Sequence, residues 1–389
     1  MSSFGVYFHI PYCLQRCTYC DFATYEKSQI LPPEKYTTLV LQEMQAKRAF
    51  YPPRLLDTIY FGGGTPSLVE PQNILQMIEG LEKLGFRRSP ETEITLEINP
   101  ATLNVGKMES YLKMGINRFS VGAQTFDNSL LKKVRREHSA QQTEETLAFL
   151  KPYGVNYSFD LLFALPGQTR EGLARDLERV LTFEPPHVSP YCLTVPAENP
   201  LSKGRPDDDQ QVAMFEQIAG VLKAAGYQQY EISNFCRPGF ESRHNQLYWQ
   251  DQEWWGLGLS SHSYWKGSPW GLRFWNPRSI HDYETHVRGL SELESPLALS
   301  PALYEDLQRH QAMTDYCHTS LRTSDGLHFH KLRSKFDEQA EQEVRSRAEP
   351  LVKRGWLTPT ETGFRLSEEG IVLSNQVFLE FTFLRPTAH

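Results

Sequence analysis

The sequence predicts an α/β fold: a partial (β/α)6 barrel followed by a C-terminal, mainly helical domain that is winged-helix-like. Two observations predict the barrel. Short β-rich runs alternate with longer helical patterns over the first two-thirds of the chain, and Gly-rich or polar residues follow the ends of these runs. In parallel α/β barrels the active site collects at the carboxyl ends of the strands. A third observation indicates what this site holds, because three cysteines stand close together at Cys13, Cys17 and Cys20.

Six βα units are expected in order along the chain. The expected strands are 6–8, 58–61, 93–98, 118–121, 157–163 and 188–193, and the expected helices are 33–50, 71–84, 105–114, 140–150, 170–181 and 211–225. Pro33 is well placed in the first turn of the first helix. A further β-rich run at 230–232 predicts an extra strand. Six units are fewer than the eight of a closed barrel, so an open barrel is expected.

The pattern changes near residue 299. Helical patterns cover 299–316 and 331–354, a polar turn at 358–363 separates two short β-rich pieces, and a final helix is expected at 367–379. This order suits a small winged-helix-like domain, and its weak basic character favours a scaffold or docking role over DNA binding. We therefore expect a barrel at 1–235, an aromatic-rich connecting region at 236–298 and an accessory domain at 299–389.

Composition narrows the function classes. The 389 residues carry 40 Lys and Arg against 47 Asp and Glu, and the net charge of -7 argues against nucleic acid as the main partner. The sequence contains no apolar run long enough for a transmembrane helix and no secretory signal pattern, which favours a cytoplasmic protein. The three remaining cysteines, Cys192, Cys236 and Cys317, are scattered, as expected in a reducing compartment.

The three clustered cysteines predict a site for a soft metal. A cubane iron–sulfur cluster normally takes four cysteine ligands, so three would leave one iron open to an outside ligand. A zinc site is the alternative, but it needs a fourth ligand, and His9 just upstream directly continues the expected strand 6–8. A disulfide is a weaker alternative, because an odd number of cysteines cannot pair internally.

Two further features lie at expected strand ends. The glycines at 62–64 let the backbone approach a ligand closely, and no Lys-Ser/Thr pair follows to make a phosphate loop. A tight turn is the alternative for this run. Glu97 is suited to hydrogen bonds with ribose hydroxyls, and a solvent-facing charge is its alternative.

The CxxxCxxC spacing with Tyr19 before the last cysteine resembles the radical S-adenosylmethionine (SAM) superfamily, in which the open iron binds SAM. The resemblance is closest to the oxygen-independent coproporphyrinogen oxidase family, and it rests on the segments 7–13 (YFHIPYC), 62–66 (GGGTP), 96–100 (LEINP), 120–126 (SVGAQTF) and 160–169 (DLLFALPGQT). It implies a [4Fe-4S] cluster on the three cysteines. The SAM contacts that it implies are Tyr7, Tyr19, Gly63, Gly64, Thr65, Glu97, Gln124, Arg136, Asp160 and Cys192. Relatives usually carry glycine before the arginine that corresponds to Arg136, where this chain has Arg135.

Two features point to one branch of that family. Coproporphyrinogen dehydrogenases carry a fourth cysteine where this chain has Phe22, and residues 244–249 (HNQLYW) resemble the HNxxYW motif of HemW-type haem chaperones. The resemblance implies haem binding near His244 and transfer of haem to acceptor proteins. It also implies a reductant for the cluster, and it leaves a membrane-associated acceptor and a dimer open. Relatives tend to have Gly-Ala-His where this chain has Ser260, Ser261 and His262.

The aromatic content around His244 supports this interpretation. Six of the seven tryptophans lie between residues 249 and 275. Flat apolar side chains beside a histidine suit a porphyrin, although a core between domains is the alternative. The alternative function is a radical SAM oxidase or methyltransferase that acts on a tetrapyrrole. A tRNA-modifying enzyme is disfavoured by the acidic balance.

Overall fold

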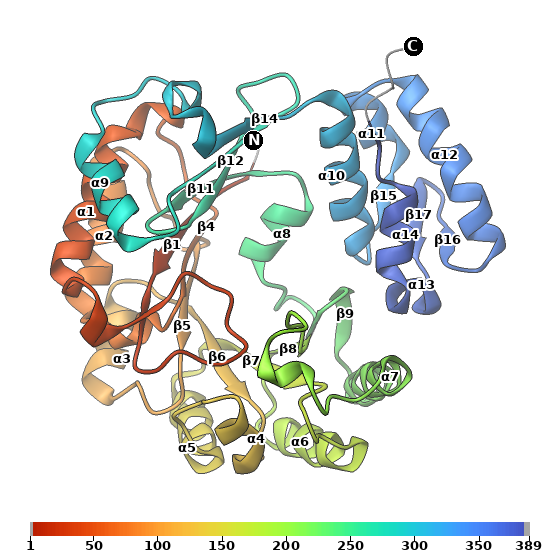
Figure 1. The fold of residues 1–389 in the computed structure, drawn as a ribbon, viewed down its shortest axis with the longest axis horizontal. Helices are drawn as coiled ribbons and strands as arrows, with labels where there is room; N and C mark the ends of the chain where they lie inside the picture. The colour runs from red at the N-terminus through yellow and green to blue at the C-terminus, as the bar shows by residue number, and fades with distance from the viewer. Residues whose placement is uncertain (1–2, 385–389) are drawn as a thin grey trace.

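The computed structural model describes residues 3–384, and one large open sheet dominates it (Figure 1). Its twelve strands lie in the order β14-β13-β12-β11-β1-β4-β5-β6-β7-β8-β10-β9. The six barrel strands pair in parallel and are β1 (Phe4–Ile10), β4 (Thr58–Gly63), β5 (Glu93–Ile98), β6 (Arg118–Gln124), β7 (Asn156–Phe163) and β8 (His187–Cys192). The predicted partial barrel is therefore confirmed.

The expected helices connect these strands. They are α1 (Pro33–Ala46), α2 (Pro71–Lys83), α3 (Val105–Lys113), α5 (Ala140–Leu150), α6 (Arg170–Thr182) and α7 (Asp208–Ala224), with the additional short helix α4 (Asn128–Lys133) after β6. Two capping boxes fix helix starts: Ser139 caps α5, and Asp207 caps α7 so that it begins before the expected residue 211. The first expected helix is shorter than predicted, because α1 ends at Ala46 and residues 48–50 form a 3₁₀ turn.

The sheet continues beyond the barrel strands at both sides. On one side β10 (Asn234–Cys236) pairs antiparallel with β8 and with β9 (Gln228–Glu231), which confirms the extra strand. On the other side β11 (Glu253–Leu257) pairs parallel with β1, and the sheet continues antiparallel through β12 (His262–Trp265), β13 (Leu272–Trp275) and β14 (Tyr304–Asp306). The helix expected at 299–316 is wrong in its first part, because Tyr304 and Glu305 pair with the free edge of β13. The division at 235 and 298 stays a prediction.

Two helices accompany this extension. The helix α8 (Arg243–Trp249) packs on the inner side of the barrel against β1, β4 and β11, and it lies near the centre of Figure 1. The helix α9 (Ile280–Gly289) packs against α1. A two-stranded ladder of β2 (Tyr12–Cys13) and β3 (Tyr25–Glu26) frames the cysteine loop.

The C-terminal part forms a separate apolar core, drawn in blue in Figure 1. Its helices are α10 (Arg309–Arg322), α11 (Phe329–Lys335), α12 (Glu338–Lys353), α13 (Glu368–Val372) and α14 (Ser374–Glu380), and its small sheet has the order β15 (Leu327–His328), β17 (Gly363–Leu366) and β16 (Leu357–Pro359). The single helix expected at 331–354 is two helices, because Asp337 caps the start of α12 by accepting a hydrogen bond from the N–H of Ala340. The final helix is likewise divided at Leu373.

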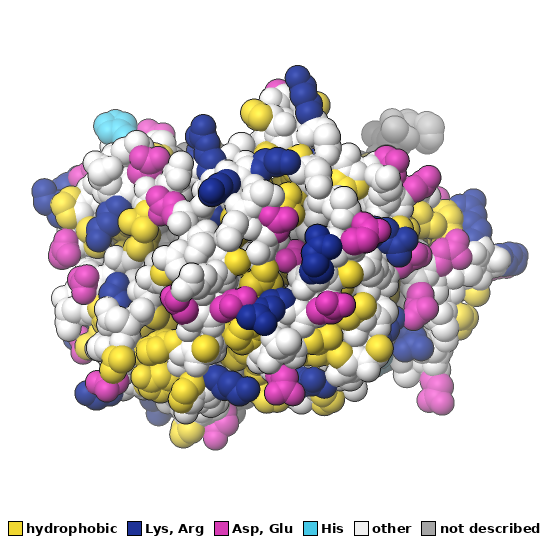
Figure 2. Space-filling view, turned by 90° about the horizontal axis from the view of Figure 1, so that it is seen from below, with side chains coloured by type: hydrophobic (Ala, Val, Ile, Leu, Met, Phe, Trp, Pro, Cys, Tyr) yellow, Lys and Arg dark blue, Asp and Glu magenta, His cyan; other side chains and the backbone are white. Residues whose placement is uncertain are grey.

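The surface and the helices add two observations. On the face shown in Figure 2, basic and acidic side chains are interspersed. Within residues 3–384, no helix combines the length and the apolar character that a membrane crossing requires.

Candidate functional site

The three clustered cysteines lie in the loop that follows β1. Their thiols are half-buried and form no disulfide. Two hydrogen bonds to the Thr18 backbone hold the middle of the loop: the N–H of Thr18 donates to the carbonyl of Val134 at 3.2 Å, and the Asn199 side-chain amide donates to the carbonyl of Thr18 at 2.9 Å. The Tyr19 side chain packs against a small apolar cluster at the barrel mouth. The loop is therefore anchored on the barrel between its cysteines.

Within residues 3–384, Arg136 is the cation whose side chain contacts one of these thiols. Its guanidinium lies 3.6 Å from the Cys17 sulfur, donates to Asn99 at 2.6 Å and contacts the carbonyl of Gly122. Its Nε is buried without a hydrogen-bond partner in the described chain. Burial raises the pKa of the Cys13 thiol to about 11 and also raises the pKa of Cys20, so proton release must accompany metal binding there.

These residues fit an iron–sulfur cluster. The three thiols are free, and the guanidinium beside Cys17 can stabilise the negative charge of thiolate ligands. Among residues 3–384, no three His, Cys, Asp or Glu side chains converge on a point that could hold a single metal ion. A four-iron cluster is larger than one ion, so its ligands need not converge in this way.

The glycine run at the end of β4 packs tightly against β1 and β2. Gly63 has a φ of +116°, and a Cβ on it would stand 2.6 Å from the His9 ring; a Cβ on Gly64 would stand 2.5 Å from the carbonyl oxygen of Tyr12. The N–H of Gly63 donates to Glu97, the N–H of Gly64 to Ile10 and the N–H of Thr65 to Tyr12. The run can therefore offer a ligand carbonyl oxygens rather than these N–H groups, which suits an ammonium group.

Glu97 and Asp160 occupy the inside of the barrel. Glu97 accepts hydrogen bonds from the Tyr60 hydroxyl at 2.8 Å and from the N–H of Gly63 at 3.0 Å, and burial raises its pKa to about 7. Asp160 accepts from Ser120 at 2.8 Å and from Ser158 at 3.1 Å, and burial raises its pKa to about 6. Both carboxyls are thus poised near neutral pH.

Two other expected SAM contacts, Gln124 and Cys192, differ in burial. Gln124 ends β6 with a left-handed φ of 68° and a buried side chain, which is strained for a residue other than glycine. Cys192 is exposed, and its thiol lies 3.4 Å from Gln211 of α7. The sequence interpretation missed Asn99 and Ser120, which orient Arg136 and Asp160.

His244 lies inside the barrel on α8. It is 1% exposed, its Nδ1 is hydrogen-bonded to the Thr58 hydroxyl at 2.6 Å and its Nε2 to the Tyr248 hydroxyl at 2.8 Å. Its ring stacks on Tyr60 at 5.1 Å between centroids. A Cβ on Gly5 of β1 would stand 2.4 Å from Leu247, so α8 packs directly on the backbone of β1 with no room for a larger side chain at residue 5. Both ring nitrogens are therefore committed to the protein, and burial lowers the pKa of His244 to about 3.

A cavity of about 570 Å³ opens beside the cysteine loop. It lies between the inner end of β1, the loop residues 21–23, the hairpin β12–β13 and the C-terminal helices α10 and α11. Its aromatic lining is Tyr7, Phe22, Tyr248, Trp249, Trp254 and Tyr264, and its charged lining is Asp21, Asp251, Asp315, Arg273, Arg278 and Lys335. The sequence located the aromatic-rich stretch at 249–275, and the cavity adds Tyr7 and Phe22 from the N-terminal part of the chain, which no sequence pattern linked to that stretch.

Comparisons with known proteins agree with this geometry. The model of the radical SAM superfamily matches residues 7–180, and that of the HemN C-terminal domain matches residues 307–373. The heme chaperone HemW of Lactococcus lactis is 32% identical over 386 residues, which are 97% of this chain and 97% of that protein. This chain belongs to the HemW family. The HemW proteins of Bacillus subtilis (30% identical, 97% of this chain and 98% of that one) and Escherichia coli (35% identical, 66% and 69%) are similar as well.

A solved structure supports the fold of this HemW family member independently. Coproporphyrinogen III oxidase (HemN) of Escherichia coli, a radical SAM enzyme, superposes with a TM-score of 0.81, covering 98% of this chain and 90% of that one at 21% identity. The HemW relatives and the radical SAM match confirm the family resemblance expected from the cysteine spacing, the HNxxYW motif and Phe22. A [4Fe-4S] cluster and SAM are the cofactors that the radical SAM superfamily implies.

Proposed function

We propose that this protein binds haem in the cavity beside the cysteine loop and transfers it to acceptor proteins. The observation that carries this proposal is the cavity itself, because about 570 Å³ of space is lined by six aromatic side chains and three cations. Flat apolar walls suit the faces of a porphyrin, and cations suit its carboxylates. The relatives' printed name, heme chaperone, supports the same function.

The second part of the proposal concerns the cofactors. Cys13, Cys17 and Cys20 hold a [4Fe-4S] cluster, and one iron stays open to the amino and carboxylate groups of SAM. The SAM contacts that we propose are Tyr7, Tyr19, Gly63, Gly64, Thr65, Glu97, Gln124, Arg136, Asp160 and Cys192. When bound, the cluster would supply an electron to SAM at its open iron. This chain's residues orient the groups: Arg136 faces the Cys17 sulfur at 3.6 Å, and Glu97 fixes the glycine run.

His244 supports the haem cavity in this proposal without binding iron. Its Nε2 holds the Tyr248 hydroxyl at 2.8 Å, and Tyr248 lines the cavity. Loss of His244 would free Tyr248 and leave a hole behind the cavity wall. The HNxxYW motif then acts through its tyrosine and tryptophan, which face the ligand, and through its histidine, which positions them.

The proposal extends to partners and location. A reductant delivers electrons to the cluster, the protein acts in the cytoplasm, and its acceptor lies at a membrane. The barrel at 1–235 holds the cluster, while the regions 236–298 and 299–389 complete the haem cavity. Self-association is tested by light scattering with and without haem, and the acceptor's location by transfer of haem to vesicles that carry an apo-haemoprotein.

Haem titration tests the central proposal. The reconstituted protein should bind one haem per chain with a shift of the Soret band, and it should then lose haem to an apo-haemoprotein. In parallel, coproporphyrinogen III with SAM and reductant should remain unchanged. Absence of haem binding contradicts the chaperone proposal. Catalytic consumption of coproporphyrinogen III would instead favour the alternative function, a radical SAM oxidase. The fold shared with HemN is compatible with that alternative.

A further inference from the structure

His262 is a histidine of the cavity that the HNxxYW motif does not include. It begins β12, its side chain is exposed to the cavity, and no hydrogen bond to its ring nitrogens is present within residues 3–384. His9 also lines the cavity, but its Nδ1 is bonded to the Tyr7 hydroxyl at 3.1 Å and its Nε2 to the carbonyl of Ala23 at 2.9 Å. Of these two histidines, His262 is therefore the one whose imidazole is free to bind a ligand.

The strand pairing gives His262 a defined position. His262 pairs with Trp275 and Tyr264 pairs with Arg273 across β12 and β13, so these four side chains share one face of the hairpin. The His262 ring stacks on Trp275 with centroids 5.7 Å apart. The indole N–H of Trp254 donates to the carbonyl of His262 at 2.9 Å. The ring and the backbone of His262 are thus both held in place, while its two ring nitrogens remain available to a ligand.

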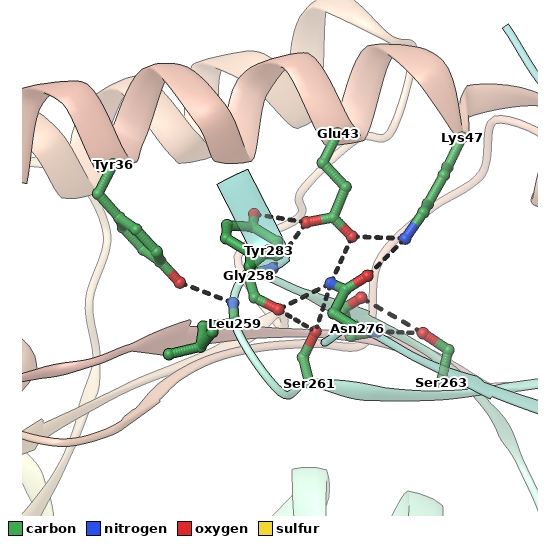
Figure 3. A network of polar contacts seen from close by, with 10 residues as sticks. Tyr36, Glu43, Lys47, Gly258, Leu259, Ser261, Ser263, Asn276 and Tyr283 are labelled. Atoms are coloured by element: carbon green, nitrogen blue, oxygen red, sulfur yellow. Dashed lines mark hydrogen bonds and ion pairs between the residues drawn. The ribbon is translucent and has the colours of Figure 1, made fainter. Parts of the chain in front are cut away.

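The turn before His262 is anchored to α1 and to Asn276 by buried hydrogen bonds. Figure 3 shows that Glu43 of α1 accepts a hydrogen bond from the N–H of Gly258 at 2.9 Å and that Asn276 donates to the carbonyl of Gly258 at 2.7 Å. Ser261 donates to the same carbonyl at 2.7 Å. This fully buried network fixes residues 258–261 and hence the point from which β12 starts.

The surroundings of His262 suit a porphyrin with an iron at its centre. Trp254 and Tyr264 pack 5.4 Å apart on the neighbouring strands and offer apolar surface beside the imidazole. Burial, and then the positive charge of Arg273, lower the pKa of His262, which keeps the imidazole neutral as iron requires. Arg273 contacts Asp315 of α10, and Lys335 of α11 pairs with Asp251 at 2.5 Å. These cations lie in the same cavity and can face the two carboxylates of haem.

We propose that His262 is the axial ligand of the haem iron in this cavity, with Arg273 and Lys335 facing the haem carboxylates. This inference rests on the proposed haem binding and adds the ligand to it. A second cavity, of about 870 Å³, lies between α8 and the C-terminal part and is the competing location. It is lined by His328 and His330, and both ring nitrogens of His328 are engaged, by Asp325 at 2.9 Å and by Thr362 at 2.7 Å. His330 is thus the matched control for His262.

Haem titration of the full chain, without reconstitution of the cluster, tests this assignment. The variants are H262A, H262C and H330A, and the readouts are haem affinity, the Soret band and the iron–histidine vibration of the ferrous state. H262A should lose the iron–histidine vibration and bind haem at least roughly tenfold more weakly, equivalent to about 1.4 kcal/mol. Added imidazole should restore the histidine-type spectrum. H330A should match the unmodified protein.

Three outcomes would overturn the assignment. H262A with an unchanged vibration and affinity excludes His262 as the ligand while leaving haem binding intact, and loss of the vibration in H330A moves the site to the second cavity. Absence of haem binding by the unmodified protein removes both the ligand and the proposed function. Should H262A fail to fold, as judged by circular dichroism, H262C decides: a thiolate-type spectrum supports the assignment and an unchanged histidine spectrum overturns it.

Discussion

The guanidinium of Arg136 lies 3.6 Å from the sulfur of Cys17, although 119 residues separate the two in the chain. The contact exists because the backbone of the cysteine loop is tied to the end of α4, where the N–H of Thr18 donates to the carbonyl of Val134. Arg136 follows that carbonyl by two residues. A cation is thereby presented to a loop whose thiols become anionic when they bind iron.

Substitution of Arg136 should weaken the cluster site without removing it. R136A deletes a charge-assisted contact worth about 1.5–3 kcal/mol, so fewer iron and sulfide equivalents should be retained after anaerobic reconstitution. C17S removes a ligand and should leave no four-iron complement. Iron and sulfide analysis with electron paramagnetic resonance measures both effects. The neighbouring R135A and the distant C192S serve as controls, and a full four-iron complement in C17S would refute the ligand assignment.

Two departures from the relatives' pattern fall at strained backbone positions. Arg135 and Ser260 occupy positions where the relatives carry glycine, and their φ angles are 57° and 55°. The left-handed conformation costs about 1–2 kcal/mol for residues other than glycine, part of which glycine returns through its larger unfolded-state entropy. R135G and S260G should therefore each raise the free energy of unfolding by several tenths of a kcal/mol to about 1 kcal/mol.

Chemical denaturation with urea measures this gain. The matched control is K203G, in which glycine replaces an exposed loop residue with the ordinary φ of -86° and should not stabilise. Unchanged or lower stability in both R135G and S260G would show that the surroundings have already relieved the strain.

Glu97 should make stability fall as pH rises. Its pKa is raised by burial from the ordinary 4.5 to about 7, so the folded state holds its proton more tightly than the unfolded state does. The contribution of Glu97 to the free energy of unfolding is therefore largest below pH 4.5. It is lost as the pH rises from 4.5 to about 7, by up to about 3 kcal/mol. E97Q stays neutral, so the difference in unfolding free energy between E97Q and the unmodified apo-protein should grow in favour of E97Q across that window. Exposed E109Q is the control, and parallel pH profiles for E97Q and the unmodified chain would contradict the prediction.

The barrel was predictable because its strands and helices alternate in hydrophobic pattern and because Pro33 marks the start of its first helix, whereas the cap Asp207 was missed and α7 begins before the expected residue 211. The edge strand β14 was not, since it has only Tyr304–Asp306 and exists because the edge of β13 accepts it. The spacing of the cysteines and the position of Glu97 at a strand end are visible in the sequence, and their roles as cluster ligands and SAM contact stay predictions. The cavity was not, because it is built from residues as far apart as Tyr7, Trp254 and Lys335. His244 shows what a sequence motif cannot predict. The motif locates this histidine in the chain, but it does not reveal that both ring nitrogens are hydrogen-bonded to side chains inside the barrel.

Phe22 should contribute to haem binding. It is 63% exposed and lines the cavity two residues after Cys20, so it offers apolar surface that a porphyrin can cover. F22A should weaken haem binding two- to fivefold, about 0.5–1 kcal/mol, while leaving cluster assembly unchanged. Leu14 of the same loop is 56% exposed and does not line the cavity, so L14A is the matched control. Equal haem affinities in F22A and L14A would remove Phe22 from the haem site.

Breaking the buried ion pair of Glu43 and Lys47 should lower the free energy of unfolding strongly. Both side chains are 0% exposed, their charged atoms lie 2.8 Å apart, and Lys47 also donates to Asn276 at 2.7 Å (Figure 3). K47M leaves the Glu43 carboxylate buried without its cation, so the free energy of unfolding should fall by about 3–5 kcal/mol. Because Glu43 also holds the N–H of Gly258 and the hydroxyl of Tyr283, the turn before His262 should loosen and haem affinity should fall with stability.

The double variant E43Q/K47M separates charge from packing in this network. An amide at residue 43 can still accept from Gly258 and Tyr283 and no longer needs a cation, so the double variant should recover much of the stability that K47M loses. Urea unfolding of the four species gives the coupling energy of the pair, and haem titration of the same four species shows whether the turn at 258–261 follows it. K47M within about 1 kcal/mol of the unmodified protein would mean that water or another group neutralises Glu43, since an unpaired buried carboxylate costs more than this. Full stability in E43Q/K47M with weakened haem binding would instead show that the pair positions the turn more than it stabilises the fold.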